Sequence, residues 1–164
     1  MQREWKRMGM TDNFEYRTAH PDEWQDAMGL AWRVFLKFVA PGYSGEGISS
    51  FRDFLTDNEL YHMFTAGSYR LFCAFDAGRM VGMITLRGGQ HISLLFVDEN
   101  YQHRGIGAAL IQAAGQFVCG RSGCRLTVNA APDAVGFYHK VGFLDTDTER
   151  LADGIRYVPM EFFL

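Results

Sequence analysis

The feature that most constrains this 164-residue chain is a change of periodicity between residues 91 and 118. Its first part, His91–Val97, is largely apolar, and a period of two would place Ile92, Leu94 and Phe96 together on one face of a strand. After a short polar stretch, apolar residues recur at helical spacing from Ile106 to the end of the segment. The sequence therefore predicts a buried strand that leads into a helix through a glycine-containing turn.

The turn between this strand and this helix is suited to binding an anion. The first backbone N–H groups of a helix have no acceptor inside it, and the helix dipole adds partial positive charge at that end. Gly105 and Gly107 carry no side chains that would hold a phosphate away from the backbone, and His103 and Arg104 can add charge. We therefore expect an anionic ligand here, and a pyrophosphate in particular.

Two common phosphate-binding motifs do not fit the spacing of these glycines. A P-loop needs Lys followed by Ser or Thr after its last glycine, where this chain has Ala108 and Ala109. A Rossmann fingerprint needs a glycine three residues after Gly107, and that position is Leu110. The remaining pattern, Gln-x-x-Gly-x-Gly/Ala beginning at Gln102, resembles the acyl-CoA-binding motif of the GNAT superfamily of acyl-CoA-dependent N-acetyltransferases.

The resemblance continues downstream, so that it covers residues 69 to 164. Residues 125–129 resemble the fifth strand of the family, which ends in Asn, and residues 134–143 resemble the short helix and the Gly-Phe pair that follow it. The resemblance implies an α/β fold of the α+β type, with a mixed, mostly antiparallel central sheet of about seven strands flanked by about four helices. We expect a single domain over residues 13–164 after a flexible N-terminus at residues 1–12.

Composition and charge exclude several other classes of protein. The net charge of −3 provides no general attraction to nucleic acid or to an anionic membrane, so neither is expected as a partner. Residues 1–11 contain no apolar run of the length expected of a signal peptide, no stretch reaches transmembrane length, and Cys73, Cys119 and Cys124 have no metal-binding or redox spacing. We therefore expect a cytoplasmic protein with reduced cysteines and no metal.

Periodicity and turn residues outline the remaining elements. The final apolar strand contains Pro159, which favours an edge strand or a bulge and leaves open a homodimer formed through this strand. A Pro- and Gly-rich loop is expected at residues 39–47. The expected strands are 14–17, 69–76, 79–86 and 155–163, and the expected helices are 21–38 and one from 48 to 55 or 60.

The resemblance implies how acetyl-CoA would be held. The backbone of Leu95, Phe96 and Val97 would pair with the pantetheine amides like an added strand, because the family's fourth and fifth strands diverge. Asn129, at the end of the fifth strand, would bond the pantetheine arm. The residues expected to hold the pyrophosphate are Gln102, His103, Arg104, Gly105, Ile106, Gly107 and Ala108.

The resemblance also suggests catalytic and acceptor-binding residues. Tyr138 matches a Tyr that serves as general acid toward the leaving sulfur, and with an ordinary pKa of about 10 it stays protonated at neutral pH. Many members have a Glu eleven residues before the motif's Gln, where this chain has His91, a competent general base. Glu46 is the second candidate for the base, and Tyr43 and Glu46 are candidate acceptor contacts in the loop that usually lines the acceptor pocket.

The expected activity is acetyl-CoA-dependent N-acetyltransfer, in which a primary amine attacks the thioester directly. The alternative from another class is a non-catalytic acyl-CoA sensor or interaction module on the same fold, which would not need Tyr138. A third possibility is transfer of a longer acyl group. Polyamines, aminoglycosides, amino acids and exposed peptide amines all remain open as acceptors, because this scaffold fixes the donor chemistry better than the acceptor.

Overall fold

A computed structural model describes residues 13–118 and 124–164, so the expected flexible N-terminus and Cys119 lie outside the described residues. The described residues form eight strands, five α-helices and four short 3-10 helices. The strands are β1 (Glu15–Thr18), β2 (Tyr69–Asp76), β3 (Arg79–Arg87), β4 (His91–Val97), β5 (Arg125–Ala130), β6 (Leu144–Asp145), β7 (Arg150–Ala152) and β8 (Ile155–Phe163). The helices are η1 (Pro21–Glu23), α2 (Trp24–Phe38), η2 (Ala40–Gly42), α3 (Gly45–Leu55), α4 (Asn58–Thr65), η3 (Glu99–Tyr101), α5 (Ile106–Val118), η4 (Pro132–Ala134) and α6 (Val135–Val141).

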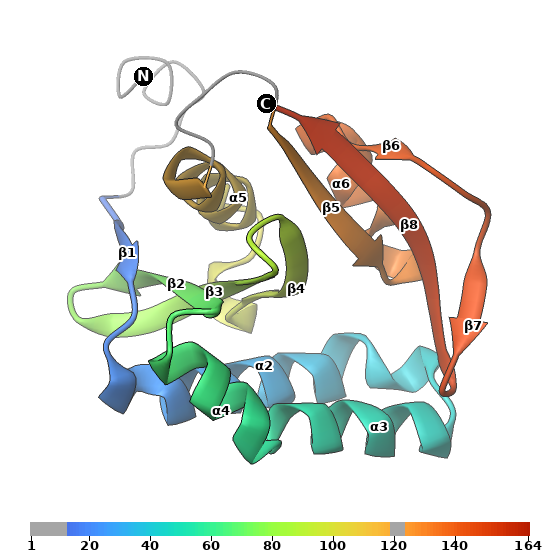
Figure 1. Cartoon of the computed structure of the whole chain (residues 1–164), viewed down its shortest axis with the longest axis horizontal. Helices are drawn as coiled ribbons and strands as arrows, with labels where there is room; N and C mark the ends of the chain where they lie inside the picture. Colours follow the sequence, from blue (N-terminus) through green and yellow to red (C-terminus); the bar gives the residue numbers. More distant parts are fainter. Residues whose placement is uncertain (1–12, 119–123) are drawn as a thin grey trace.

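The strands form one sheet in the order β1-β2-β3-β4-β5-β8-β6, with β7 paired to β8. All neighbouring strands are antiparallel except β4 and β5, which are parallel. The expected mixed, mostly antiparallel sheet is confirmed, with two short strands, β6 and β7, beyond the ones that periodicity predicted. The parallel pair is the point where the chain leaves the sheet as α5 and returns as β5 (Figure 1).

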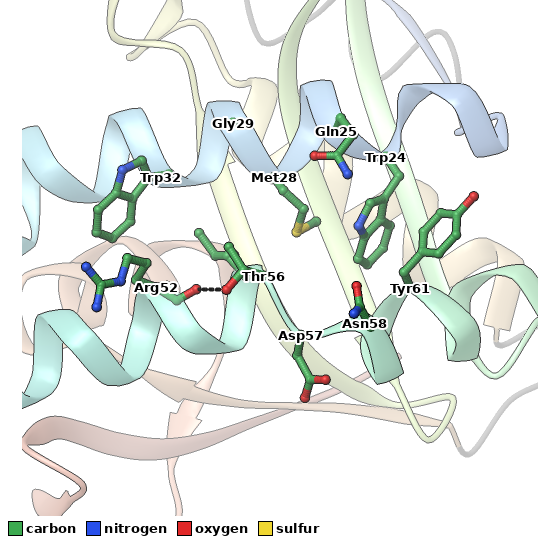
Figure 2. Close-up of a pocket in the computed structure, with 11 residues that line it drawn as sticks. Trp24, Gln25, Met28, Gly29, Trp32, Arg52, Thr56, Asp57, Asn58 and Tyr61 are labelled. Atoms are coloured by element: carbon green, nitrogen blue, oxygen red, sulfur yellow. Dashed lines mark hydrogen bonds between the residues drawn. The ribbon is translucent and has the colours of Figure 1, made fainter.

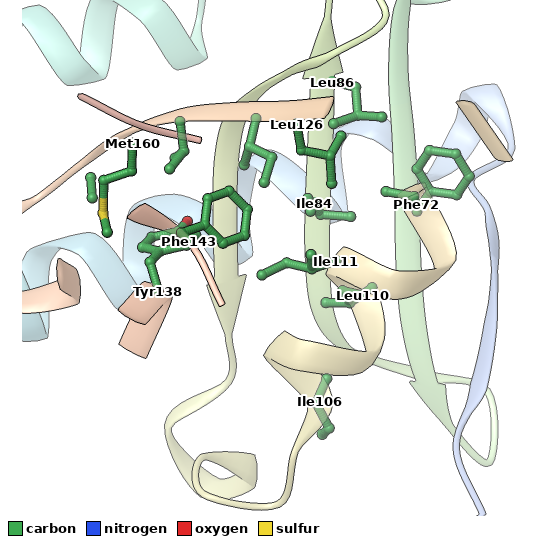
Figure 3. Close-up of a cluster of buried hydrophobic side chains, with 14 of the residues drawn as sticks. Phe72, Ile84, Leu86, Ile106, Leu110, Ile111, Leu126, Tyr138, Phe143 and Met160 are labelled. Atoms are coloured by element: carbon green, nitrogen blue, oxygen red, sulfur yellow. The ribbon is translucent and has the colours of Figure 1, made fainter. Parts of the chain in front are cut away.

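Helices cover both faces of the sheet, and each face has its own core. Helices α2, α3 and α4 lie below the sheet in the view of Figure 1, and α5 lies above it. The core on the α2 side includes Trp24, Met28 and Leu94. The core on the α5 side joins Leu110 to Tyr138 and other residues of the C-terminal half (Figure 3). Burial of these apolar side chains is the main stabilising contribution on each face.

The second helical segment differs from the expected single helix because it is divided in two. Helix α3 ends at Leu55 and α4 begins at Asn58. The Asp57 side chain accepts a hydrogen bond from the backbone N–H of Glu59 at 2.9 Å, so it caps the new helix. Asp57 is the sequence signal for this break between the helices, but it lies within an apolar pattern of helical period and was therefore not recognised.

Strand β8 is not an edge strand, so the expectation based on Pro159 is wrong in this respect. It pairs with β5 on one side and with β6 and β7 on the other. The Pro159 carbonyl accepts a hydrogen bond from the N–H of Thr146, just after β6 ends at Asp145. The N and the carbonyl of a strand residue point to the same side, so the nitrogen of Pro159 faces β6 and not β5. The absence of an N–H at Pro159 therefore removes no hydrogen bond from the ladder between β5 and β8. A dimer formed by pairing along this strand would need to displace existing strands.

The two described cysteines differ in state. Cys73 is a buried free thiol in β2, and burial raises its pKa to about 12, so it is unreactive. Cys124 is disulfide-bonded, and the expectation of reduced cysteines is wrong for this residue. Within the described residues, no helix combines the length and apolar character that crossing a membrane requires.

Candidate active site

The sheet opens where β4 and β5 diverge. These strands pair only at His91 with Thr127 and at Ile92 with Val128. Beyond Ile92, the β5 side of β4 has no partner strand among the described residues, although β4 continues to Val97. Backbone N–H and C=O groups along this edge are therefore available to an extended ligand.

A β-bulge near the start of β4 changes which way its side chains face. Leu94 pairs with Thr85 and Ile92 pairs with Leu86, so Ser93 is one extra residue between two adjacent residues of β3. Ile92 consequently lies in the core on the α5 side, whereas Leu94 lies in the core on the α2 side. The predicted common face of Ile92, Leu94 and Phe96 is wrong because simple alternation does not pass through a bulge.

A cavity of about 480 Å³ lies beside this opening and brings together six of the candidate site residues, whereas Gln102–Ala108 lie outside its lining. Its walls come from α2, α3, β4, β5, α6 and the β7–β8 hairpin. Neither Glu46 nor Val97 contributes to the lining. The candidate residues that line it are Tyr43, His91, Leu95, Phe96, Asn129 and Tyr138.

His91 is held at the first position of β4. Its Nδ1 is 2.8 Å from the Thr127 hydroxyl of β5, which fixes the orientation of the imidazole ring and leaves Nε2 for other partners. Burial and the positive charge of Arg87 both lower the pKa of His91. The imidazole is therefore neutral at pH 7, with a lone pair that can accept a proton.

Tyr138 is buried in α6 but its hydroxyl has no hydrogen-bond partner among the described residues. Only 5% of the residue is exposed, and it lines the cavity. The described residues contain no buried side-chain polar atom without a partner, so the hydroxyl reaches the cavity surface. Burial raises the pKa of Tyr138, which keeps the hydroxyl protonated as a hydrogen-bond donor.

The two candidate acceptor contacts are placed differently. Tyr43 lines the cavity, its ring lies edge-on to Phe35, and its hydroxyl donates to the carbonyl of Arg156 at 3.4 Å. Glu46 is exposed in the first turn of α3, where its charge favourably opposes the helix dipole. The geometry thus supports a site role for Tyr43 and a helix-stabilising role for Glu46.

The loop before α5 has the backbone shape expected of an anion site. His103 and Gly105 have left-handed φ angles of 63° and 79°. The first backbone bond at this end runs from the N–H of Ala109 to the carbonyl of Gly105, so the preceding N–H groups have no acceptor within the helix. The side-chain amide of Gln102 donates to the Val97 carbonyl at 3.3 Å and ties the loop to the end of β4.

The structure gives a second reason for glycine at position 107, in addition to the predicted one. A Cβ built at Gly107 would lie 3.1 Å from Cζ of Phe137 in α6, closer than nearly all real contacts. The glycine therefore allows α6 to approach α5, and it does not simply leave space for a phosphate. Its N–H still belongs to the exposed first turn of α5.

A second cavity, of about 740 Å³, lies between α2 and the α3–α4 pair (Figure 2). It is larger, but it shares no lining residue with the cavity at the sheet opening. Trp24, Trp32 and Asp57 are among its walls, and β4 and β5 contribute nothing to it. We assign the candidate site to the smaller cavity because only that one combines a neutral imidazole, a buried hydroxyl and an unpaired strand edge.

Several site residues gave no signal in the sequence. Thr127 orients His91, but it lies 36 positions further along the chain. Arg87 lines the cavity and is paired with His91 across the β3–β4 ladder. Asp153 and Tyr157 reach the cavity from the β7–β8 hairpin. Only the fold brings these residues together, although an Arg directly before a Gly-Gly turn could have drawn attention to Arg87.

Comparisons with known proteins identify the family. The sequence model of the acetyltransferase (GNAT) domain family matches residues 39–164. The Escherichia coli K12 N-acetyltransferase YafP is 26% identical over 140 residues, which cover 85% of this chain and 87% of YafP. The chain therefore belongs to the GNAT family of N-acetyltransferases.

Solved structures show the same fold. A GCN5-related N-acetyltransferase from Rhodopseudomonas palustris superposes with a TM-score of 0.77 and 23% identity, covering 92% of this chain and 95% of the other. The PaiA N-acetyltransferase from Thermoplasma acidophilum, solved in complex with coenzyme A, gives a TM-score of 0.73 and 23% identity, covering 93% and 99%.

Proposed function

We propose that this protein transfers an acetyl group from acetyl-CoA to a primary amine by direct attack of the amine on the thioester. The observation that carries the proposal is the meeting of His91 and Tyr138 in one cavity beside the unpaired edge of β4. A neutral base and a protonated hydroxyl are the two groups that this reaction requires. A sensor that binds an acyl-CoA without turnover would need neither.

The chain offers suitable groups for the pantetheine arm and for the pyrophosphate of acetyl-CoA. The backbone of Leu95, Phe96 and Val97 at the open edge of β4 would bond the pantetheine amides, with the Val97 carbonyl already accepting a hydrogen bond from Gln102, and Asn129 would hold the same arm from β5. The residues of the loop and first turn of α5, from Gln102 to Ala108, would hold the pyrophosphate through backbone N–H groups and the side chains of His103 and Arg104. Bound acetyl-CoA supplies an activated acyl group.

The proposed transfer assigns one proton to each catalytic group. His91 Nε2 accepts the proton that the amine nitrogen loses as its bond to the acetyl carbon forms. Tyr138 Oη donates a hydrogen bond, and then a proton, toward the sulfur as the carbon–sulfur bond breaks. Exchange with cavity water restores both residues. The products are an N-acetylated amine and the free thiol of CoA.

The test is release of CoA thiol from acetyl-CoA, followed with a thiol-reactive dye across polyamines, aminoglycosides, amino acids and Lys-containing peptides. Calorimetry measures acetyl-CoA binding in parallel. Amine-dependent release at a rate well above that without protein is expected. Binding without release for any amine would favour the sensor alternative, and absence of binding would contradict the role proposed for Gln102–Ala108.

A further inference from the structure

One wall of the cavity is continuous and aromatic. Phe35 and Phe51 stack with ring centroids 4.0 Å apart, and Tyr43 and Phe96 extend this wall at 5.6 and 5.8 Å. Such a wall favours an acceptor with an aromatic or large apolar body, since flat rings pack well against it. A highly charged acceptor would bury polar groups against it at a cost.

The charged groups of the lining are one cation and one carboxylate. Arg87 is the single Lys or Arg among the described residues that line this cavity, and Asp153 is the single carboxylate. Arg87 is paired with His91 across the β3–β4 ladder, and its charge is close enough to lower the pKa of His91. It makes no ion pair with a carboxylate of the described residues, so its charge is available to an acceptor anion.

The neighbouring positions of His91 and Arg87 therefore suit an acceptor that carries an amine and an anionic group close together. If the amine of the acceptor lies at His91, a carboxylate attached to the same carbon as that amine would lie beside Arg87. An extra ammonium at this position would be repelled by the guanidinium, which argues against polyamines. A free carboxylate next to an amine occurs in α-amino acids, whereas peptide amines lack it.

The β7–β8 hairpin limits the size of the acceptor. A Cβ at Gly47 of α3 would lie 2.5 Å from the carbonyl oxygen of Gly154 at the hairpin tip, so the two backbones are in direct contact. Ser50 Oγ also donates to the Asp153 carbonyl at 3.3 Å. The tip of the β7–β8 hairpin lies beside α3 (Figure 1). Ser50 and Asp153, on the two sides of this contact, both line the cavity, so the contact closes one side of it, and a polypeptide could not pass there without separating hairpin and helix.

We propose that the acceptor is a free α-amino acid with an aromatic or large apolar side chain, an inference that rests on the proposed function. Its amine lies at His91, its carboxylate is bound by the guanidinium of Arg87, and its side chain packs on Phe51 and Phe96, the half-buried rings of the wall that the buried ring of Phe35 supports. The bonds formed and broken are those of the acetyl transfer described above.

The test compares phenylalanine with phenethylamine, which differ only in the carboxylate, at saturating acetyl-CoA. The wild type should have a kcat/KM at least about 10-fold higher for phenylalanine, and Arg87→Gln should reduce this ratio by about 10- to 100-fold. Arg87→Lys should keep part of the preference, because it retains the charge without the two-pronged geometry. Arg70→Gln, an exposed arginine of β2 outside the cavity lining, should leave the ratio unchanged.

Spermidine and a Lys-containing peptide complete the panel and separate the two proposals. Turnover of either one in clear preference to phenylalanine would overturn the amino-acid assignment and leave the acetyltransferase function intact. An equal kcat/KM for phenylalanine and phenethylamine in the wild type would also overturn the role of Arg87. If acetyl-CoA binds and none of the amines releases thiol, both proposals fall together.

Discussion

The guanidinium of Arg33 on α2 lies 2.9 Å from the carboxylate of Asp98, the residue that joins β4 to the loop before α5. The Asp98 side chain is only 3% exposed, and its other oxygen accepts from the N–H of Asn100 at 2.9 Å. Arg79 is a second, more distant cation at 3.8 Å. One buried carboxylate thus connects the helix on one face of the sheet to the chain that enters the proposed pyrophosphate loop.

Replacing Asp98 with Ala should lower the free energy of unfolding by about 2 kcal/mol, because a charge-assisted hydrogen bond and the cap on η3 are both lost. The affinity for acetyl-CoA should fall as well, since the loop loses its anchor. Chemical denaturation and calorimetry measure the two effects. Asp53→Ala removes an exposed carboxylate 3.9 Å from Arg52 and serves as the control, with almost no change expected.

Local pattern predicted the elements but not the contacts between distant parts of the chain. The strands 69–76 and 155–163 and the beginning of α5 at Ile106 were predicted correctly, because each depends on the periodicity of its own residues. The bulge at Ser93 was not predicted, since an extra residue in a strand only becomes visible against the partner strand. Arg87 and Thr127 were missed because their proximity to His91 is a property of the sheet.

The Tyr138→Phe substitution separates catalysis from stability. The hydroxyl has no partner among the described residues, so its removal should leave the melting temperature nearly unchanged. The affinity for acetyl-CoA should also be unchanged, whereas kcat should fall by about 10- to 1,000-fold if Oη supports the leaving sulfur. Thiol release and thermal unfolding are measured on the same preparation. A variant with full turnover would assign Tyr138 to packing alone.

The pH dependence of kcat/KM should report the protonation of His91. Its pKa is lowered from 6.5 by burial and Arg87, so the acidic limb should have its midpoint below pH 6.5. His91→Gln should remove this limb together with most of the activity. The free energy of unfolding should depend on the same group. Below pH 6.5 the unfolded chain binds a proton at residue 91 more tightly than the folded protein does, because the pKa of His91 is lower in the folded state. Acidification should therefore destabilise the wild type more than the variant.

The first turn of α5 can be tested with a charge at Gly107. Gly107→Glu should abolish acetyl-CoA binding, because it brings a carboxylate to the proposed pyrophosphate site. Since the new Cβ also meets Phe137, the double variant Gly107→Glu/Phe137→Ala relieves the steric conflict and should still fail to bind. Gly29→Glu, at a helical glycine with open space around it, is the matched control. Recovery of binding in the double variant would show that only the packing mattered.

The hairpin contact can be loosened at Gly154. Gly154→Ala places a Cβ 2.7 Å from the backbone nitrogen of Gly47, and φ at this position is +76°, so the hairpin tip must move. The KM for the acceptor should rise by about 10-fold, equivalent to about 1.4 kcal/mol, with the acetyl-CoA affinity unchanged. Gly78→Ala is the control: it has a similar φ of +87° but nothing within 4 Å, so it introduces backbone strain without this contact.

The bulge at Ser93 gives β4 one residue more than its ladder with β3 requires. Removing Ser93 would leave the pairs Ile92–Leu86 and Leu94–Thr85 directly next to each other, so that regular alternation returns and His91 still lies opposite Arg87. The imidazole would keep its direction, and the strand would lose only the local bend and extra twist that a bulge introduces. Relatives of this protein can therefore differ by one residue in the length of this strand and still hold the base in the same place.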